Sequence, residues 1–191
     1  EEAKGRGLII LDADEAERAQ GCASAVRAKA SAYIAPSKGR AEIPITWTDA
    51  ETGLVCKSRL DWLTINRVLV ELKSTRSTDE RNFANQAWKL GYFHAQMFYS
   101  MGVAAATECA IEEVPFLFVA VESEPPYDVA LFEPCEESRY AALEDVRKLM
   151  VRLAECQRTQ RWPGRYDEPR MLKAPAYVLM TDDDEWTTEV T

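Results

Sequence analysis

The order of helix-like and strand-like segments constrains the fold of this chain more than any other feature of its sequence. A helical pattern is present in three segments: 12–29, 79–101 and 136–157. A strand-like pattern is present in five segments: 41–48, 54–65, 68–73, 115–122 and 127–132. Turn residues separate the first three strands, which predicts an antiparallel meander. The full order, αβββαββα, predicts one mixed α/β (α+β) domain.

The size and composition of the chain suit a single globular domain. Its 191 residues are 47% apolar and 29% charged, which argues against global disorder. We expect residues 1–180 to form this domain and residues 181–191 to be an acidic, flexible tail. No apolar run approaches the roughly 20 residues of a membrane helix, and no signal-peptide pattern is visible. Five cysteines without a CxxC pair, and one histidine, argue against a zinc knuckle or disulfide scaffold and favour a cytoplasmic protein.

The charge of the chain is acidic overall but unevenly distributed. The net charge of −9 argues against a protein that coats nucleic acid without specificity, because such proteins are basic. Residues 54–103, however, carry seven Lys or Arg and four Asp or Glu, a net charge of +3. The segments before and after are both net negative. The total therefore leaves room for a local DNA site in residues 54–103.

Two acids and a lysine form the most informative pattern within that segment. Glu71 and Lys73 are two residues apart in a strand, so alternation directs both side chains to one face. Asp61 lies across the hairpin and joins them if the register allows it. Two carboxylates on one face are costly unless paired, and Mg²⁺ prefers carboxylate and carbonyl oxygens. Such a metal beside a lysine that holds the attacking water suits phosphodiester hydrolysis. A solvated face with a cross-strand salt bridge is the alternative.

Further residues are candidates for the same site. Glu42, on the preceding strand, has the parity opposite to its apolar neighbours and can reach the metal; an ordinary solvent-facing Glu is the alternative. Four cations flank the pattern and can contact phosphates, or are surface charges: Arg59, Arg76, Arg81 and Lys89. Four aromatic residues can stack on bases, or belong to the core: Trp62, Trp88, Tyr92 and Tyr99. The single histidine, His94, is a packed or exposed helical residue or a further site residue.

These residues carry a resemblance to a known family. The string Asp61-Trp62-Leu63…Glu71-Leu72-Lys73-Ser74-Thr75, with Glu42 before it, resembles the PD-(D/E)XK nuclease core. More narrowly, the chain resembles the RecE (exonuclease VIII)-like exonucleases of phages and prophages over residues 8–177. Co-linear features that support the narrower resemblance are Gly91-Tyr92 leading to Gln96 and Tyr99, residues 118–122 followed by 125–129, and Cys156…Trp162-Pro163-Gly164.

The resemblance implies a restriction-endonuclease-like core, with a central mixed sheet flanked by helices. Asp61 and Glu71 resemble the metal-binding acids, the Leu72 carbonyl a further ligand, Lys73 the catalytic lysine and Glu42 the upstream assisting acid. Gln96 and Tyr99 resemble a QxxxY element that holds DNA, although they are three residues apart instead of four. The resemblance also implies an upstream helix with a histidine at the metal site; we expect that this segment was lost or removed, or that the protein does without it.

The function implied is that of a Mg²⁺-dependent exodeoxyribonuclease, with Mn²⁺ as a substitute, that degrades one strand from the ends of double-stranded DNA. A single-strand annealing (RecT-like) protein is the implied partner in recombination, a homo-oligomeric ring the implied assembly, and no membrane is involved. Three alternatives stay open: a PD-(D/E)XK endonuclease or structure-specific nuclease, a nuclease-derived DNA-binding module with reduced activity, and a non-enzymatic protein with a salt-bridged hairpin.

Overall fold

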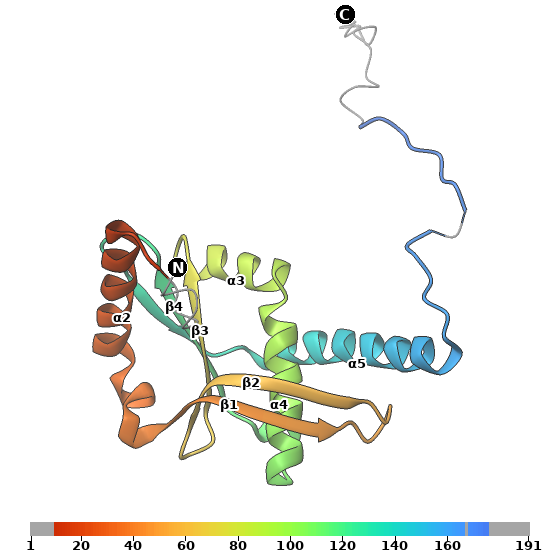
Figure 1. Cartoon of the computed structure of the whole chain (residues 1–191), viewed down its shortest axis with the longest axis horizontal. Coiled ribbons are helices and arrows are strands. Elements are labelled where there is room, and N and C mark those ends of the chain that lie inside the picture. Colours follow the sequence, from red (N-terminus) through yellow and green to blue (C-terminus); the bar gives the residue numbers. More distant parts are fainter. Residues whose placement is uncertain (1–9, 167, 176–191) are drawn as a thin grey trace, which may run out of the picture. The chain divides into compact units, whose positions relative to one another are not determined.

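The computed structural model describes residues 10–166 and 168–175 (Figure 1). Its helices are α2 (Ala13–Ile34), α3 (Glu80–Lys89), α4 (Tyr92–Thr107) and α5 (Glu136–Thr159), with short 3₁₀ turns at Pro36–Lys38 and Ile111–Glu113. Its strands are β1 (Gly39–Thr48), β2 (Val55–Thr64), β3 (Leu69–Thr75), β4 (Phe116–Glu122) and β5 (Val129–Phe132). All five strand-like segments of the sequence are therefore strands, and the predicted tail 181–191 lies outside the described residues.

The strands form one five-stranded sheet in the order β1-β2-β3-β4-β5. Neighbouring strands are antiparallel except β3 and β4, which run parallel from Leu69 opposite Phe116 to Thr75 opposite Glu122. A parallel pair needs a long crossover connection, and α3 and α4 supply it. The fold is thus a mixed α/β fold with a mixed sheet, as the sequence predicts.

Helices cover both faces of the sheet (Figure 1). On one face, α2 packs through Val26 and Ala30 against Val70 of β3 and alternate residues of β4. On the other, α3 and α4 pack through residues such as Phe83 and Val103 against a core centred on β3 and β4. The start of α2 is as predicted, because Asp12 and Glu15 form a reciprocal capping box with bonds of 2.8 and 3.0 Å. Among the described residues, no helix is long and apolar enough to cross a membrane.

The helix predicted over 79–101 is two helices, which corrects the sequence interpretation. Gly91 separates them with φ +73°, a left-handed conformation that ends α3 and precedes α4. Glycine adopts this conformation without steric cost, so it marks the break here instead of weakening a continuous helix. The second helix also runs beyond the predicted end, to Thr107. The break places Tyr92 at the first position of α4.

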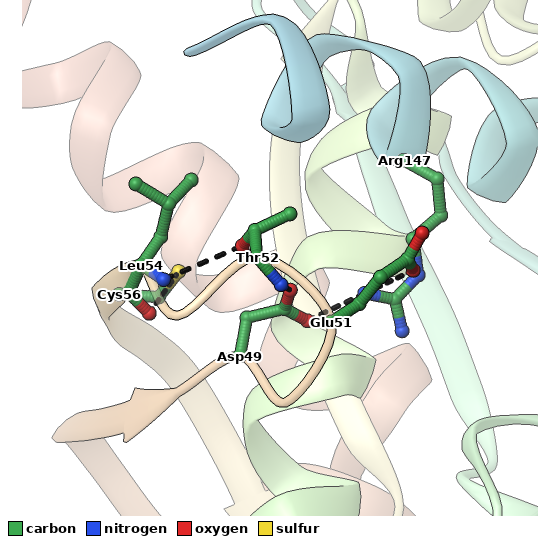
Figure 2. A network of polar contacts seen from close by, with 6 residues as sticks. All are labelled: Asp49, Glu51, Thr52, Leu54, Cys56 and Arg147. Atoms are coloured by element: carbon green, nitrogen blue, oxygen red, sulfur yellow. Dashed lines mark hydrogen bonds and ion pairs between the residues drawn. The ribbon is translucent and has the colours of Figure 1, made fainter. Parts of the chain in front are cut away.

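A buried carboxylate holds the turn between β1 and β2 (Figure 2). Asp49 is 4% exposed and accepts hydrogen bonds from the backbone N–H and the hydroxyl of Thr52, at 2.9 and 2.7 Å. It also pairs with the guanidinium of Arg147 on α5, which lies 3.6 Å from Glu51. Burial raises the pKa of Asp49, but the hydrogen bonds from Thr52 and the pairing with Arg147 outweigh it, so the pKa lies below 3.8. These contacts fasten the end of the β1–β2 hairpin to α5.

Candidate active site

Glu71 and Lys73 project from β3 toward α3 and α4. Leu69, on the same face of the strand, is fully buried in the core beneath these helices. Glu71 is only 4% exposed, and its Oε1 lies 2.6 Å from Nζ of Lys73. The two side chains thus share one face of the strand, as their spacing predicts. The local sequence alone brings this pair together.

Asp61 reaches the pair because the β2–β3 ladder stops short of it. Among the described residues, the ladder pairs Trp62 with Val70 and Leu63 with Leu69, and the same register continued would set Asp61 opposite Glu71. In place of a backbone bond there, Oδ2 of Asp61 accepts a hydrogen bond from the N–H of Leu72 at 3.0 Å. The carboxylate of Asp61 is therefore held against β3 at Leu72, the residue between Glu71 and Lys73.

A break in the alternation of β2 accompanies this arrangement. Leu60 and Leu63 both pack in the core under α3 and α4, although they are three residues apart. Strict alternation from Arg59, which is exposed, would group Asp61 with the outward-facing cations of the strand. The break instead brings the charge of Asp61 close enough to raise the pKa of Glu71. Nothing in the local sequence signals this shift.

The environment of Glu71 favours binding of a cation. Burial raises its pKa, the bond from Lys73 lowers it, the charge of Asp61 raises it, and the net shift is upward. Its Oε2 is buried with no hydrogen-bond partner among the described residues. A buried carboxylate oxygen without a partner is costly, and a cation beside it would remove that cost. This unpartnered oxygen is the observation on which the metal interpretation depends.

Lys73 is held in its charged form. Burial lowers its pKa, but the hydrogen bond and charge of Glu71, with the charge of Asp61, outweigh burial and raise the pKa above 10.5. Its Nζ also lies 4.9 Å from the ring centroid of Tyr92, a cation–π distance. Lys73 can therefore donate hydrogen bonds and positive charge to a ligand at this site. The contact from Tyr92 is a feature that the sequence pattern missed, and the only signal for it is Gly91, which starts a new helix at that residue.

The two residues of the QxxxY-like element lie in different environments. Burial raises the pKa of Tyr99, and the charges of Glu71 and Asp61 raise it further, so its phenol lies within electrostatic range of the site. Gln96 is 1% exposed, and its Nε2 donates to Ser100 Oγ at 3.3 Å, while its Oε1 has no partner among the described residues. The DNA contact of Gln96 stays a prediction.

Glu42 does not join the predicted metal ligands. It has φ +53°, and its Oε2 lies 2.8 Å from Nε of Arg59 in an exposed ion pair. Across residues 10–166 and 168–175, no three or more His, Cys, Asp or Glu side chains gather as metal ligands. The structure thus brings two of the predicted carboxylates together, Asp61 and Glu71, while Glu42 pairs with Arg59 and its metal role stays a prediction.

The remaining candidate residues lie either at the surface or packed against other side chains. Arg76, Arg81 and Lys89 are exposed, whereas Trp62 packs against the α2 side of the sheet and donates from Nε1 to the carbonyl of Tyr33 at 3.0 Å. Trp62 thus follows the core alternative of the sequence analysis. His94 lies 3.4 Å from Asp145, and its ring contacts Trp88 at 5.1 Å.

The donors at this site fit a hard divalent cation. Mg²⁺ is commonly bound by one or two carboxylates together with water and substrate phosphate, so Asp61 and Glu71 suffice as protein side chains. The backbone carbonyl of Leu72, between Glu71 and Lys73, stays a predicted further ligand. A site of this kind neutralises charge on a phosphate while a lysine is held beside it.

A family model described as a PDDEXK-like domain of unknown function (DUF3799) matches residues 3–175. The chain belongs to this family. The PDDEXK-like chain is 17% identical to a crystal structure of a "Putative exonuclease" from Eubacterium rectale, with a TM-score of 0.61, over 85% of this chain and 64% of that one. At that identity the likeness shows the fold, and the PDDEXK-like chain spans 64% of the length of that protein.

Two further comparisons add no functional information. A second solved structure, SSO0001, is 18% identical and covers 77% of this chain and 59% of that one. Its TM-score is 0.40, too low to indicate a shared fold. No curated protein matches the chain significantly. The family match and the fold likeness together show a PDDEXK-like domain.

Proposed function

We propose that this PDDEXK-like domain is a Mg²⁺-dependent deoxyribonuclease, with Mn²⁺ as a working substitute. The observation that carries the proposal is the buried, unpartnered Oε2 of Glu71, with Asp61 held across from it and Lys73 bonded to its other oxygen. When bound, the cation would neutralise the phosphate and favour attack by water. The remaining roles belong to the residues of this chain.

Each side chain has a role that follows from its position. Asp61 and Glu71 hold the cation, with the Leu72 carbonyl as a further ligand. Lys73 is positively charged and partly buried, so it donates a hydrogen bond to the attacking water or to a phosphate oxygen. The hydrogen bond from the Leu72 N–H holds Asp61 in place, and the Tyr92 ring holds the ammonium of Lys73.

We propose further that the substrate is the end of double-stranded DNA. The co-linear resemblance to RecE-like exonucleases supports this, as does the fold likeness to a protein named an exonuclease. In that proposal the enzyme acts in phage-type recombination with a RecT-like annealing protein, and a homo-oligomeric ring is its assembly. The net charge of +3 over residues 54–103 suits a DNA substrate.

The test uses linear and covalently closed circular duplex DNA of one sequence, each with Mg²⁺ and with EDTA. We expect loss of the linear DNA only, and only with Mg²⁺. Cleavage of closed circles would indicate an endonuclease instead. Binding of DNA without hydrolysis of either form would indicate a DNA-binding module. The variants Asp61→Asn and Lys73→Ala should be inactive while keeping the circular dichroism spectrum of the parent chain.

A further inference from the structure

A groove adjoins the candidate active site on the side of α3. Its volume is about 720 Å³, and it lies between the end of β3, one side of α3 and the first residue of α4. Eight of its lining residues carry side-chain hydrogen-bond donors: Ser74, Thr75, Arg76, Asn85, Gln86, Lys89, Tyr92 and Ser123. None of the described residues that line it is acidic. In a chain with a net charge of −9, such a groove is suited to an anion.

The groove leads directly to the reaction centre. Tyr92 lines it, and the ring of Tyr92 lies 4.9 Å from Nζ of Lys73. Thr75, which also lines the groove, is two residues after Lys73 in β3, so alternation places both side chains on one face of the strand. A polymer bound in the groove would therefore lie beside Tyr92, whose ring contacts Lys73.

A buried hydroxyl holds one donor of the groove in position. Thr75 is 4% exposed, and its hydroxyl oxygen lies 3.0 Å from the carbonyl of Ser77 and 3.1 Å from Oε1 of Gln86. The Gln86 side chain is thereby held at the groove, and a carboxamide carries N–H donors for a ligand. Arg76 and Lys89 are exposed, one just after β3 and the other at the end of α3, so cations bracket the amides.

We propose that this groove binds the sugar-phosphate backbone of the DNA strand next to the bond that is cut. Arg and Lys with amide and hydroxyl donors are the groups that contact DNA phosphates in proteins, and they do so without reading the bases. The inference rests on the proposed nuclease function, since it extends the same site. It makes Arg76, Asn85, Gln86 and Lys89 substrate-positioning residues.

The test measures binding of a fluorescein-labelled 20-base-pair duplex in EDTA, so that hydrolysis does not interfere. Each lost phosphate contact should reduce the slope of log affinity against log salt by about 0.9. We expect this reduction for Arg76→Ala and for Lys89→Ala. The matched control is Arg27→Ala, an exposed cation on α2 at the other face of the sheet, which should leave the slope unchanged.

A second pair of variants separates the groove from long-range charge. Asn85→Asp and Asn82→Asp make the same change at two exposed positions of α3, and only Asn85 lines the groove. We expect Asn85→Asp to weaken binding about fivefold or more, through a carboxylate beside a phosphate, and Asn82→Asp to change it less than about twofold. Equal losses in both variants would overturn the groove proposal.

The outcomes distinguish the two proposals. Hydrolysis by the parent chain with unchanged salt slopes in both groove variants overturns the groove and leaves the nuclease function. Groove-dependent binding without hydrolysis in Mg²⁺ or Mn²⁺ overturns the nuclease function and leaves the groove as a DNA-binding surface. A parent chain that does not bind DNA overturns both.

Discussion

Nζ of Lys73 lies 2.6 Å from one carboxylate oxygen of Glu71, while the other oxygen is buried without a partner among the described residues. One carboxylate thus has two different environments: the first oxygen positions the lysine, and the second is available to a cation. The N–H of Leu72, between the two residues, fixes Asp61 nearby. Each of these side chains can therefore be substituted separately.

Removing either acid charge should abolish hydrolysis. Glu71→Gln and Asp61→Asn keep the shape of each side chain but remove a ligand charge, so we expect rates to fall by at least about 100-fold. Rates on linear duplex in Mg²⁺ measure this. Glu42→Gln is the matched control, because Glu42 pairs with Arg59 at the surface, and its rate should stay within about twofold of the parent. A loss with Glu42→Gln as large as with Glu71→Gln would restore Glu42 to the site.

The ring of Tyr92 should matter more than its hydroxyl. Tyr92→Phe keeps an aromatic face beside the ammonium of Lys73, whereas Tyr92→Leu removes it. A cation–π contact contributes about 0.5–2 kcal/mol, so we expect Tyr92→Leu to lower the hydrolysis rate between about twofold and about thirtyfold. Tyr92→Phe should be close to the parent. Equal losses in both variants would show that the phenol oxygen, not the ring face, is what the site uses.

The Asp49–Arg147 pair should contribute to stability in a pH-dependent manner. Asp49→Asn leaves Arg147 without its buried partner, and we expect a loss of about 2–3 kcal/mol in the free energy of unfolding at pH 7. Because the pKa of Asp49 in the folded chain lies below 3.8, this contribution is present above pH 3.8 and is lost as pH falls through the folded-state value. Urea unfolding of parent and variant between pH 7 and pH 3 measures it.

An exposed ion pair supplies the control for that measurement. Arg18 and Glu124 lie 3.3 Å apart with both side chains largely exposed, so Arg18→Met should cost less than about 1 kcal/mol at pH 7. A loss for Asp49→Asn no larger than that for Arg18→Met would contradict a special role for the buried carboxylate. A gap between parent and Asp49→Asn that stays constant down to pH 3 would contradict the pH dependence.

The break between α3 and α4 should depend on the backbone at Gly91. Within the described residues, a Cβ there would lie within 4 Å of Nδ1 of His94 alone, at 3.9 Å, so space is not the obstacle. The left-handed conformation costs an alanine about 1–2 kcal/mol and an asparagine less. We therefore expect Gly91→Ala to lower the free energy of unfolding more than Gly91→Asn does, in urea titrations. The opposite order would show that the loop adopts another conformation in solution.

Much of the fold could be predicted because it depends on local pattern. Local patterns marked all five strands, alternation in β1 and a continuous apolar run in β4 among them, and the Asp12–Glu15 spacing marked the start of α2. The break at Gly91 could not be predicted, because a glycine inside an apolar helical pattern is compatible with a continuous helix until the packing of both halves is known. The parallel pairing of β3 with β4 is likewise invisible in either strand by itself.

The chemistry of the candidate site was determined by the sequence alone, since Glu71 and Lys73 share a strand face whatever surrounds them. Only the tertiary structure decided which other groups join them. The shift in β2 brings Asp61 in, Glu42 pairs with Arg59, Gln96 is buried, and the helix break brings Tyr92 to Lys73. Each of these depends on strand register or on contacts between distant segments, which local periodicity does not encode.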